Sequence, residues 1–156
     1  MSNRHRYWLL LALFMGGCTS SQNISKVYPF SSYVGRTVTI QRPIAVVQTW
    51  NIWSGPRGPG GIPTLSSSAS RALKNTNDVE TGEMVYTVLP MGHPVYLESV
   101  RDEIAFDSES IVTYGRTTIP PGEKPVQVAY RWGMLWCLEP APWEPDTLPK
   151  RRYLPD

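Results

Sequence analysis

Hydrophobic and polar residues alternate along much of the chain with the period of two that is typical of β-strands. The clearest example runs from Val126 to Trp132, where Val126, Val128, Tyr130 and Trp132 share one face. Further strands are predicted at 34–41, 44–50, 84–89, 95–100, 110–114, 116–119 and 134–138. The strands at 84–89 and 95–100 are separated by a turn rich in Gly and Pro, so we expect them to form a hairpin.

The pattern predicts a mainly β fold. No helical periodicity of useful length follows residue 18, and short strands separated by turn signals are typical of a small antiparallel β-barrel or a β-sandwich. Residues 51–70 are rich in Gly, Pro and Ser, and we expect a long loop without a persistent regular element there. Residues 140–156 hold many prolines, which predicts an extended tail laid along the domain.

The first eighteen residues have a different pattern. Two arginines precede an apolar run over residues 7–15. This run is shorter than the roughly 20 residues needed to cross a bilayer, but it has the length of a signal-peptide core, which we expect to be helical. The sequence that follows, Met15-Gly16-Gly17-Cys18, resembles the lipobox of bacterial lipoproteins, with Met where Leu is commonest.

This resemblance implies a specific processing of the chain. Cleavage would fall between Gly17 and Cys18, with a diacylglyceryl group on the Cys18 sulfur and an acyl group on its new amine. An ordinary secretory signal or an uncleaved anchor is the alternative. Because each buried CH₂ contributes about 0.8 kcal/mol, three acyl chains would hold the protein durably on a bilayer. In the sorting pattern of enteric lipoproteins, Thr19 in place of Asp implies the periplasmic face of the outer membrane rather than the inner membrane.

Together these patterns divide the chain into four parts. We predict a lipoprotein signal peptide at 1–17, a flexible lipidated tether at 18–27, a β-rich domain at 28–139 and a Pro-rich tail at 140–156. Removing the signal leaves enough chain for one compact domain but not for two.

The charge balance argues against one class of partner. The chain has 15 Lys and Arg against 13 Asp and Glu, and loss of Arg4 and Arg6 with the signal leaves 13 of each. Since non-specific nucleic-acid binding relies on many basic residues, we predict no nucleic-acid partner. Acidic residues gather between Asp78 and Glu109, and basic ones at 150–152. Either both groups are solvated faces, or they form a bipolar surface that orients a partner.

Few residues could carry chemistry. His93 is the only histidine after the signal, and no nucleophile motif accompanies it, so a turn residue is favoured over a general base. One histidine and one cysteine cannot supply a usual zinc site, and we expect no cofactor besides the covalent lipid. Cys137 lies in an apolar stretch and is predicted to be a core residue rather than a reactive thiol. Trp132 and Trp136 are also expected in the core.

Aromatic residues of the irregular segments are the remaining candidates. Exposed aromatic side chains often anchor protein partners. In this chain the candidates for partner binding are Trp50, Trp53, Trp143 and Tyr153. The alternative is that they pin the loop and the tail onto the β-domain.

The sequence therefore favours a membrane-anchored, non-enzymatic binding protein that faces the periplasm. One form is an immunity or inhibitor lipoprotein, whose partner would be a periplasmic or secreted effector protein. A structural component of an envelope assembly is the alternative of a different class. A small hydrolase that uses His93 is the third hypothesis.

Overall fold

The computed structural model describes residues 20–51, 55–57, 62–66, 83–105, 108–122 and 124–149. These residues form ten strands and one short 3-10 helix, η1 (Phe30–Ser32). The strands are β1 (Ser20–Asn23), β2 (Thr37–Thr39), β3 (Ile44–Asn51), β4 (Gly55–Arg57), β5 (Thr64–Ser66), β6 (Glu83–Leu89), β7 (Pro94–Ala105), β8 (Ser108–Thr118), β9 (Pro125–Met134) and β10 (Cys137–Leu138). The prediction of a mainly β fold is confirmed. No helix in these residues is long and apolar enough to span a membrane.

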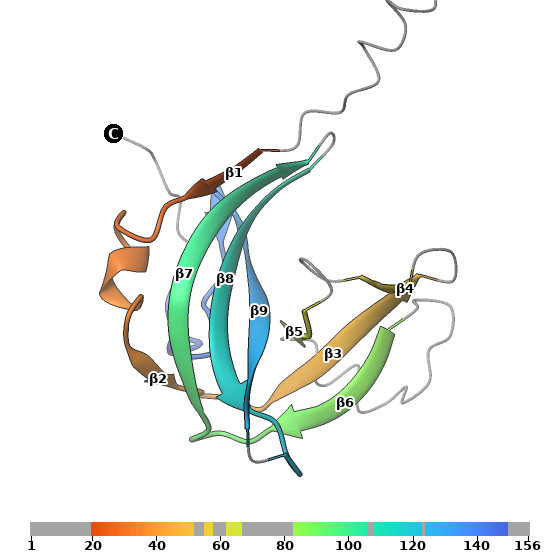
Figure 1. Ribbon diagram of the computed structural model, residues 1–156. Helices are drawn as coiled ribbons and strands as arrows, with labels where there is room; N and C mark the ends of the chain where they lie inside the picture. The colour runs from red at the N-terminus through yellow and green to blue at the C-terminus, as the bar shows by residue number, and fades with distance from the viewer. Residues whose placement is uncertain are drawn as a thin grey trace, which may run out of the picture.

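All ten strands belong to one sheet, ordered β1-β7-β8-β9-β5-β3-β4. In addition, β2 pairs with β7, β6 with β3 and β10 with β9. Figure 1 shows β7, β8 and β9 as one curved layer, with β3 and β6 inclined to it. The sheet is mixed, because β5 and β9 are parallel, and it does not close into a barrel, because β1 and β6 each pair with a single described strand. The expected antiparallel barrel or sandwich is therefore replaced by one curled, open sheet.

The chain bends where β2 leads to β3 and where β6 leads to β7. The two connections lie against each other: the Gly92 amide donates to the Ile40 carbonyl (2.8 Å), and the Ile40 amide donates to the His93 carbonyl (3.0 Å). Before the bend β6 pairs with β3, and after it β7 pairs with β2. The predicted hairpin of 84–89 with 95–100 is wrong, because this turn carries the chain around the bend instead of back along β6.

The segment before β2 lies along the edge of β7. Strand β1 pairs Ser20 with Ile104, and the Ile24 amide donates to the Val100 carbonyl (3.0 Å). The Ile24 and Phe30 side chains are buried in the core. The predicted flexible tether is therefore wrong for residues 20–27, which belong to the folded domain. The physical reason is that the edge of β7 offers backbone groups that need partners.

Two short strands occur within the predicted loop at 51–70. Strand β4 has β3 as its one described neighbour, an edge position at which the missing amide of Pro56 is tolerated. Strand β5 lies between β3 and β9, where Leu65 pairs with both Val46 and Tyr130 and is buried. The expectation of no regular element is wrong for these six residues. The other residues of 51–70, apart from Asn51, Ile62 and Pro63, lie outside the described part of the chain.

Aromatic side chains join the tail to the sheet. The Trp143 ring meets the rings of Trp132 and Tyr130 edge to face, with centroids 5.3 Å away in each case. Trp132 is buried, as predicted. The prediction of an extended tail is wrong for the described residues 140–149, because the Glu144 amide donates to the Ala141 carbonyl (2.8 Å) and closes a turn.

The predictions for Trp136 and Cys137 are wrong. Trp136 is 60% exposed and Cys137 is half-buried, because the chain reverses between β9 and β10 instead of continuing into the core. Gly133 permits this reversal, since its φ is +134° and a Cβ there would lie 2.5 Å from the Cys137 carbonyl oxygen. A one-residue bulge at Trp132 precedes it.

Candidate functional site

Strands β7, β8 and β9 present two chemically different faces because successive side chains alternate. The core face is apolar and carries residues such as Val95, Leu97 and Val128. The opposite face carries tyrosine, arginine and glutamate side chains. We call it the Tyr/Arg face and define it by Tyr96, Glu98, Arg101, Glu103, Tyr114, Arg116 and Arg131.

The side chains of this face contact one another across β7 and β8. Arg116 Nε lies 2.8 Å from Glu98 Oε1. The Tyr114 hydroxyl donates to the Glu103 carboxylate, and the Arg101 guanidinium carbon lies 5.9 Å from the centre of the Tyr114 ring, within cation–π range. Each contact joins the two strands, so this part of the face is held in place before any partner arrives.

Tyr114 stays protonated in this setting. Burial raises the pKa of its hydroxyl above the ordinary value, the hydrogen bond and charge of Glu103 raise it further, and Arg101 opposes them. A protonated hydroxyl keeps its role as the donor to Glu103. Tyr114 is therefore a positioning element of the face rather than a titrating group near neutral pH.

Arginines flank a buried valine in one row of this face. Arg101, Val112 and Arg131 pair across the three strands, and both arginines are exposed while Val112 is buried. In the described part of the chain no ion pair involves Arg131. Guanidinium groups bind carboxylates with two parallel hydrogen bonds, and arginine and tyrosine are enriched at protein interfaces. This row is suited to a protein surface that bears carboxylates.

His93 is placed as a structural contact. Its Nε2 lies 2.8 Å from Thr117 Oγ1, and the Thr117 hydroxyl donates to the Pro94 carbonyl (2.7 Å). Because the hydroxyl has a single proton, the Thr117 oxygen accepts from Nε2–H. In this geometry His93 does not remove the Thr117 proton, so the pair does not form an activated nucleophile.

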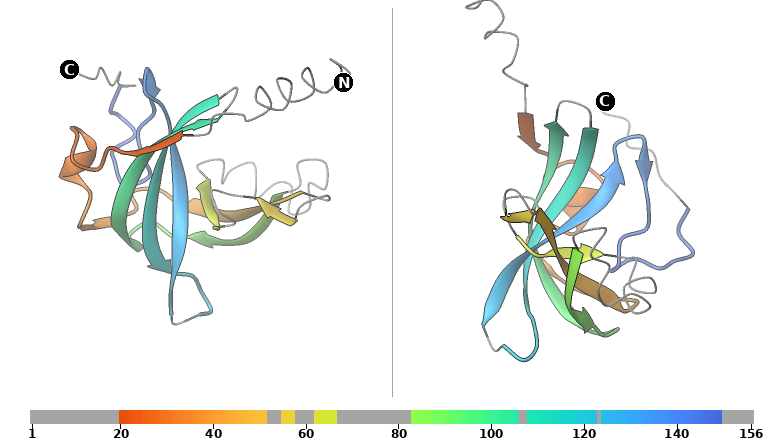
Figure 2. Two further views of the ribbon diagram at one scale, coloured as in Figure 1. Left: turned by 45° about the horizontal axis from the view of Figure 1, so that its top comes forward. Right: turned by 90° about the vertical axis from the view of Figure 1, so that its right-hand side faces the viewer.

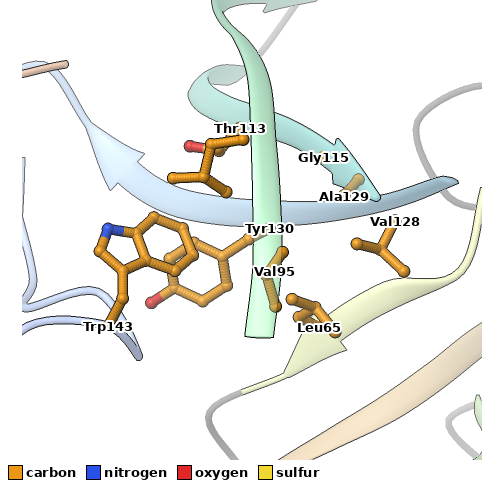
Figure 3. A pocket seen from close by; sticks show the side chains of 9 residues that line it. Leu65, Val95, Thr113, Gly115, Val128, Ala129, Tyr130 and Trp143 are labelled. Carbon is orange, nitrogen blue, oxygen red and sulfur yellow. The ribbon is translucent and has the colours of Figure 1, made fainter. Parts of the chain in front are cut away.

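Within the described ranges no group of three or more His, Cys, Asp or Glu side chains could hold a metal ion. A gap in the core, shown in Figure 3, is too narrow to admit a water molecule. It is lined mainly by apolar side chains, among them Leu65, Tyr130 and Trp143, and by Thr113, whose buried hydroxyl has no hydrogen-bond partner among the described residues. We regard it as imperfect packing rather than as a ligand site.

Among the predicted partner-binding residues, Trp143 alone has a described side chain. It is buried against Trp132, which fits the alternative that it pins the tail. Trp50 lies in β3, where its backbone pairs with Pro56, and its side chain is outside the described part. The remaining predicted site residues lie outside the described residues, and these are Gly17, Cys18, Trp53 and Tyr153.

The Tyr/Arg face was not predicted, because the order of charges along the chain does not show which strands pair or which side chains share a face. Adjacent acids in β7 separate: Asp102 is buried, whereas Glu103 bonds to Tyr114 on the Tyr/Arg face. Glu98 pairs with Arg116 of the next strand. The acidic segment 78–109 is therefore not a single solvated face. Alternation of Tyr, Arg and Glu along 96–103 was the signal available in the sequence.

Comparison with known proteins gave no match: no family model, no curated protein and no solved structure is significantly similar to the chain.

Proposed function

We propose that the chain is a bacterial lipoprotein precursor, lipidated at Cys18, whose β-domain binds a protein partner at the periplasmic face of the outer membrane. The observation that carries the anchor is the Met15–Cys18 sequence after a short apolar run. The Tyr/Arg face supports the binding role, since it is exposed, cross-braced and rich in the residue types that anchor interfaces.

The charge of the Tyr/Arg face favours a partner that presents carboxylates. Glu98 is paired with Arg116, and Glu103 accepts from Tyr114. This leaves the exposed Arg101 and Arg131 as the groups available to an incoming acidic side chain. Such a face would serve an inhibitor of a secreted effector or a part of an envelope assembly. The identity of the bound partner decides between these two roles.

The anchor is tested by the Cys18→Ser substitution. Cells that express the natural chain should incorporate radioactive palmitate into it, and cells that express the variant should not. The variant should also accumulate at the size of the uncut precursor, because lipidation precedes cleavage in this family. Continued palmitate labelling of the variant would contradict the assignment of Cys18.

The binding role is tested by crosslinking in living cells followed by purification of the anchored protein. One dominant partner should be recovered with the natural chain and lost with Arg131→Glu, since this substitution repels carboxylates. Lys124→Glu is the matched control, because it reverses an exposed charge at the turn before β9. Equal recovery of the partner with the two variants would exclude the Tyr/Arg face as its binding surface. A partner with a toxic domain would indicate inhibition, and a set of assembly proteins would indicate a structural role.

A further inference from the structure

The end of the sheet at which the chain enters lies next to the proposed lipid. Ser20, the first residue of β1, pairs with Ile104 near the end of β7. Two residues of extended chain span at most about 7 Å, so the Cys18 Cα lies within that distance of the Ser20 Cα. A lipid on Cys18 would therefore hold this end of the sheet close to the bilayer.

The same end carries exposed apolar side chains. Ile104 is 44% exposed, Met134 is 43% exposed and Trp136 is 60% exposed. Asp102 of β7, Ile111 of β8 and Gly133 of β9 pair across three neighbouring strands. Ile104 lies two residues after Asp102 and Met134 follows Gly133, so both lie at the same end of the sheet. Figure 2 shows β1, the end of the β7–β8 pair and the β9–β10 hairpin at one end of the molecule.

We infer that this end of the sheet docks against the membrane, with Ile104, Met134 and Trp136 in contact with the lipid surface. The inference rests on the proposed lipidation of Cys18. Tryptophan suits a bilayer interface because its ring is apolar and its N–H can hydrogen-bond to headgroups and water. A water-exposed Trp at the same end of the sheet as two other exposed apolar side chains gains by leaving water.

Apolar contact rather than charge drives the docking. Two carboxylates, those of Glu103 and Glu109, flank Ile104 in the β7–β8 pair. Such groups do not attract anionic lipids, so the contact should persist as salt is raised. Loss of the contact in high salt would point to an electrostatic surface instead.

The opposite end of the sheet supplies a control position. Met91 is 68% exposed and lies in the connection that precedes β7. Ten residues of β7, from Pro94 to Glu103, lie between Met91 and Ile104, and at a rise of roughly 3.3 Å per residue they span about 33 Å along the strand. Met91 is thus an exposed apolar residue that the proposed lipid cannot bring to the bilayer.

Photoreactive side chains at positions 104, 136 and 91 of the full-length protein test the inference in living cells. Crosslinks to phospholipid are expected at 104 and 136 and not at 91, and Cys18→Ser should abolish them. Palmitate labelling of the same samples separates the two proposals. Three results with palmitate-labelled protein would overturn the docking alone. They are the absence of lipid crosslinks at 104 and 136, crosslinks to a protein at these positions, and lipid crosslinks at 91 equal to those at 104 and 136. Absence of the label overturns the anchor and, with it, the docking.

Discussion

A single buried carboxylate holds the Pro-rich C-terminal segment. Glu144 is 1% exposed, and its Oε1 accepts from the Tyr33 hydroxyl (2.7 Å) while its Oε2 accepts from the Ala141 amide (2.8 Å). Arg42 reinforces the clamp, since its Nη2 donates to the Pro140 carbonyl (2.6 Å). The Tyr33→Phe substitution removes one of these bonds and leaves the aromatic ring.

The expected loss follows from the kind of bond removed. A hydrogen bond to a charged group contributes about 1.5–3 kcal/mol to stability, and the carboxylate left without this donor has little access to water. The ring contact of residue 33 with Trp132, with centroids 5.7 Å away, is retained. A loss of about 2 kcal/mol corresponds to a fall in Tm of roughly 8 °C for a domain of this size.

Thermal and urea unfolding of the mature chain carrying Cys18→Ser measures this loss without the lipid. Tyr28→Phe is the matched control, because Tyr28 is 76% exposed and should change stability by less than about 0.5 kcal/mol. Equal stabilities of the Tyr33→Phe and Tyr28→Phe variants would refute the clamp. In a double-mutant cycle with Glu144→Gln, strict additivity of the two losses would also refute it.

Two further substitutions and one chemical labelling experiment test other features of the fold. Burial raises the pKa of Asp102, so its ionisation costs stability; this cost is absent below the unfolded value of about 3.8 and complete above the folded value. The Tm of Asp102→Asn relative to the natural chain should therefore rise as the pH is raised from about 4 to 7, and a constant difference would contradict this. Gly115→Ala should cost about 1–3 kcal/mol in urea unfolding, since its Cβ would lie 2.5 Å from the Tyr96 carbonyl oxygen, and a neutral effect would show that the sheet adapts. Because Cys137 is only half-buried, its thiol should react with iodoacetamide in the folded Cys18→Ser protein. A thiol that reacts only after unfolding would show instead that Cys137 is a core residue.

Local pattern was sufficient to predict the longer strands but neither the short ones nor the partners of any strand. The alternation over 126–132 located β9, and the β-branched run at 44–50 located β3, because each needs only the residues of its own strand. The hairpin of β6 with β7 was predicted from turn composition alone. The hydrogen bonds between Ile40 and the 92–93 turn, which decide the outcome, join residues about fifty positions apart.

Short polar segments were predicted as loops because three or four residues carry no periodicity. Strand β1 has the sequence Ser-Ser-Gln-Asn, and its side chains are exposed. What fixes it is the open edge of β7 together with the burial of Ile24 immediately after it. The prediction for Trp136 was wrong for the opposite reason. Its apolar neighbours in sequence suggested burial, but the chain reversal after Gly133 leaves its ring exposed.

Strand β1 connects the proposed lipid anchor to the sheet that carries the Tyr/Arg face. Because this strand is paired with β7 from Ser20 onward, only two residues would join the sheet to the proposed lipid at Cys18. A tether this short would fix one end of the domain at the bilayer. Strands β7, β8 and β9 would then rise from the membrane. Along β7 the Tyr/Arg face would extend from Glu103 near the lipid to Tyr96 farther away, a separation of about 23 Å. A partner could reach this face from the side, so proteins standing in or on the same membrane, as well as proteins arriving from the periplasm, would have access to it.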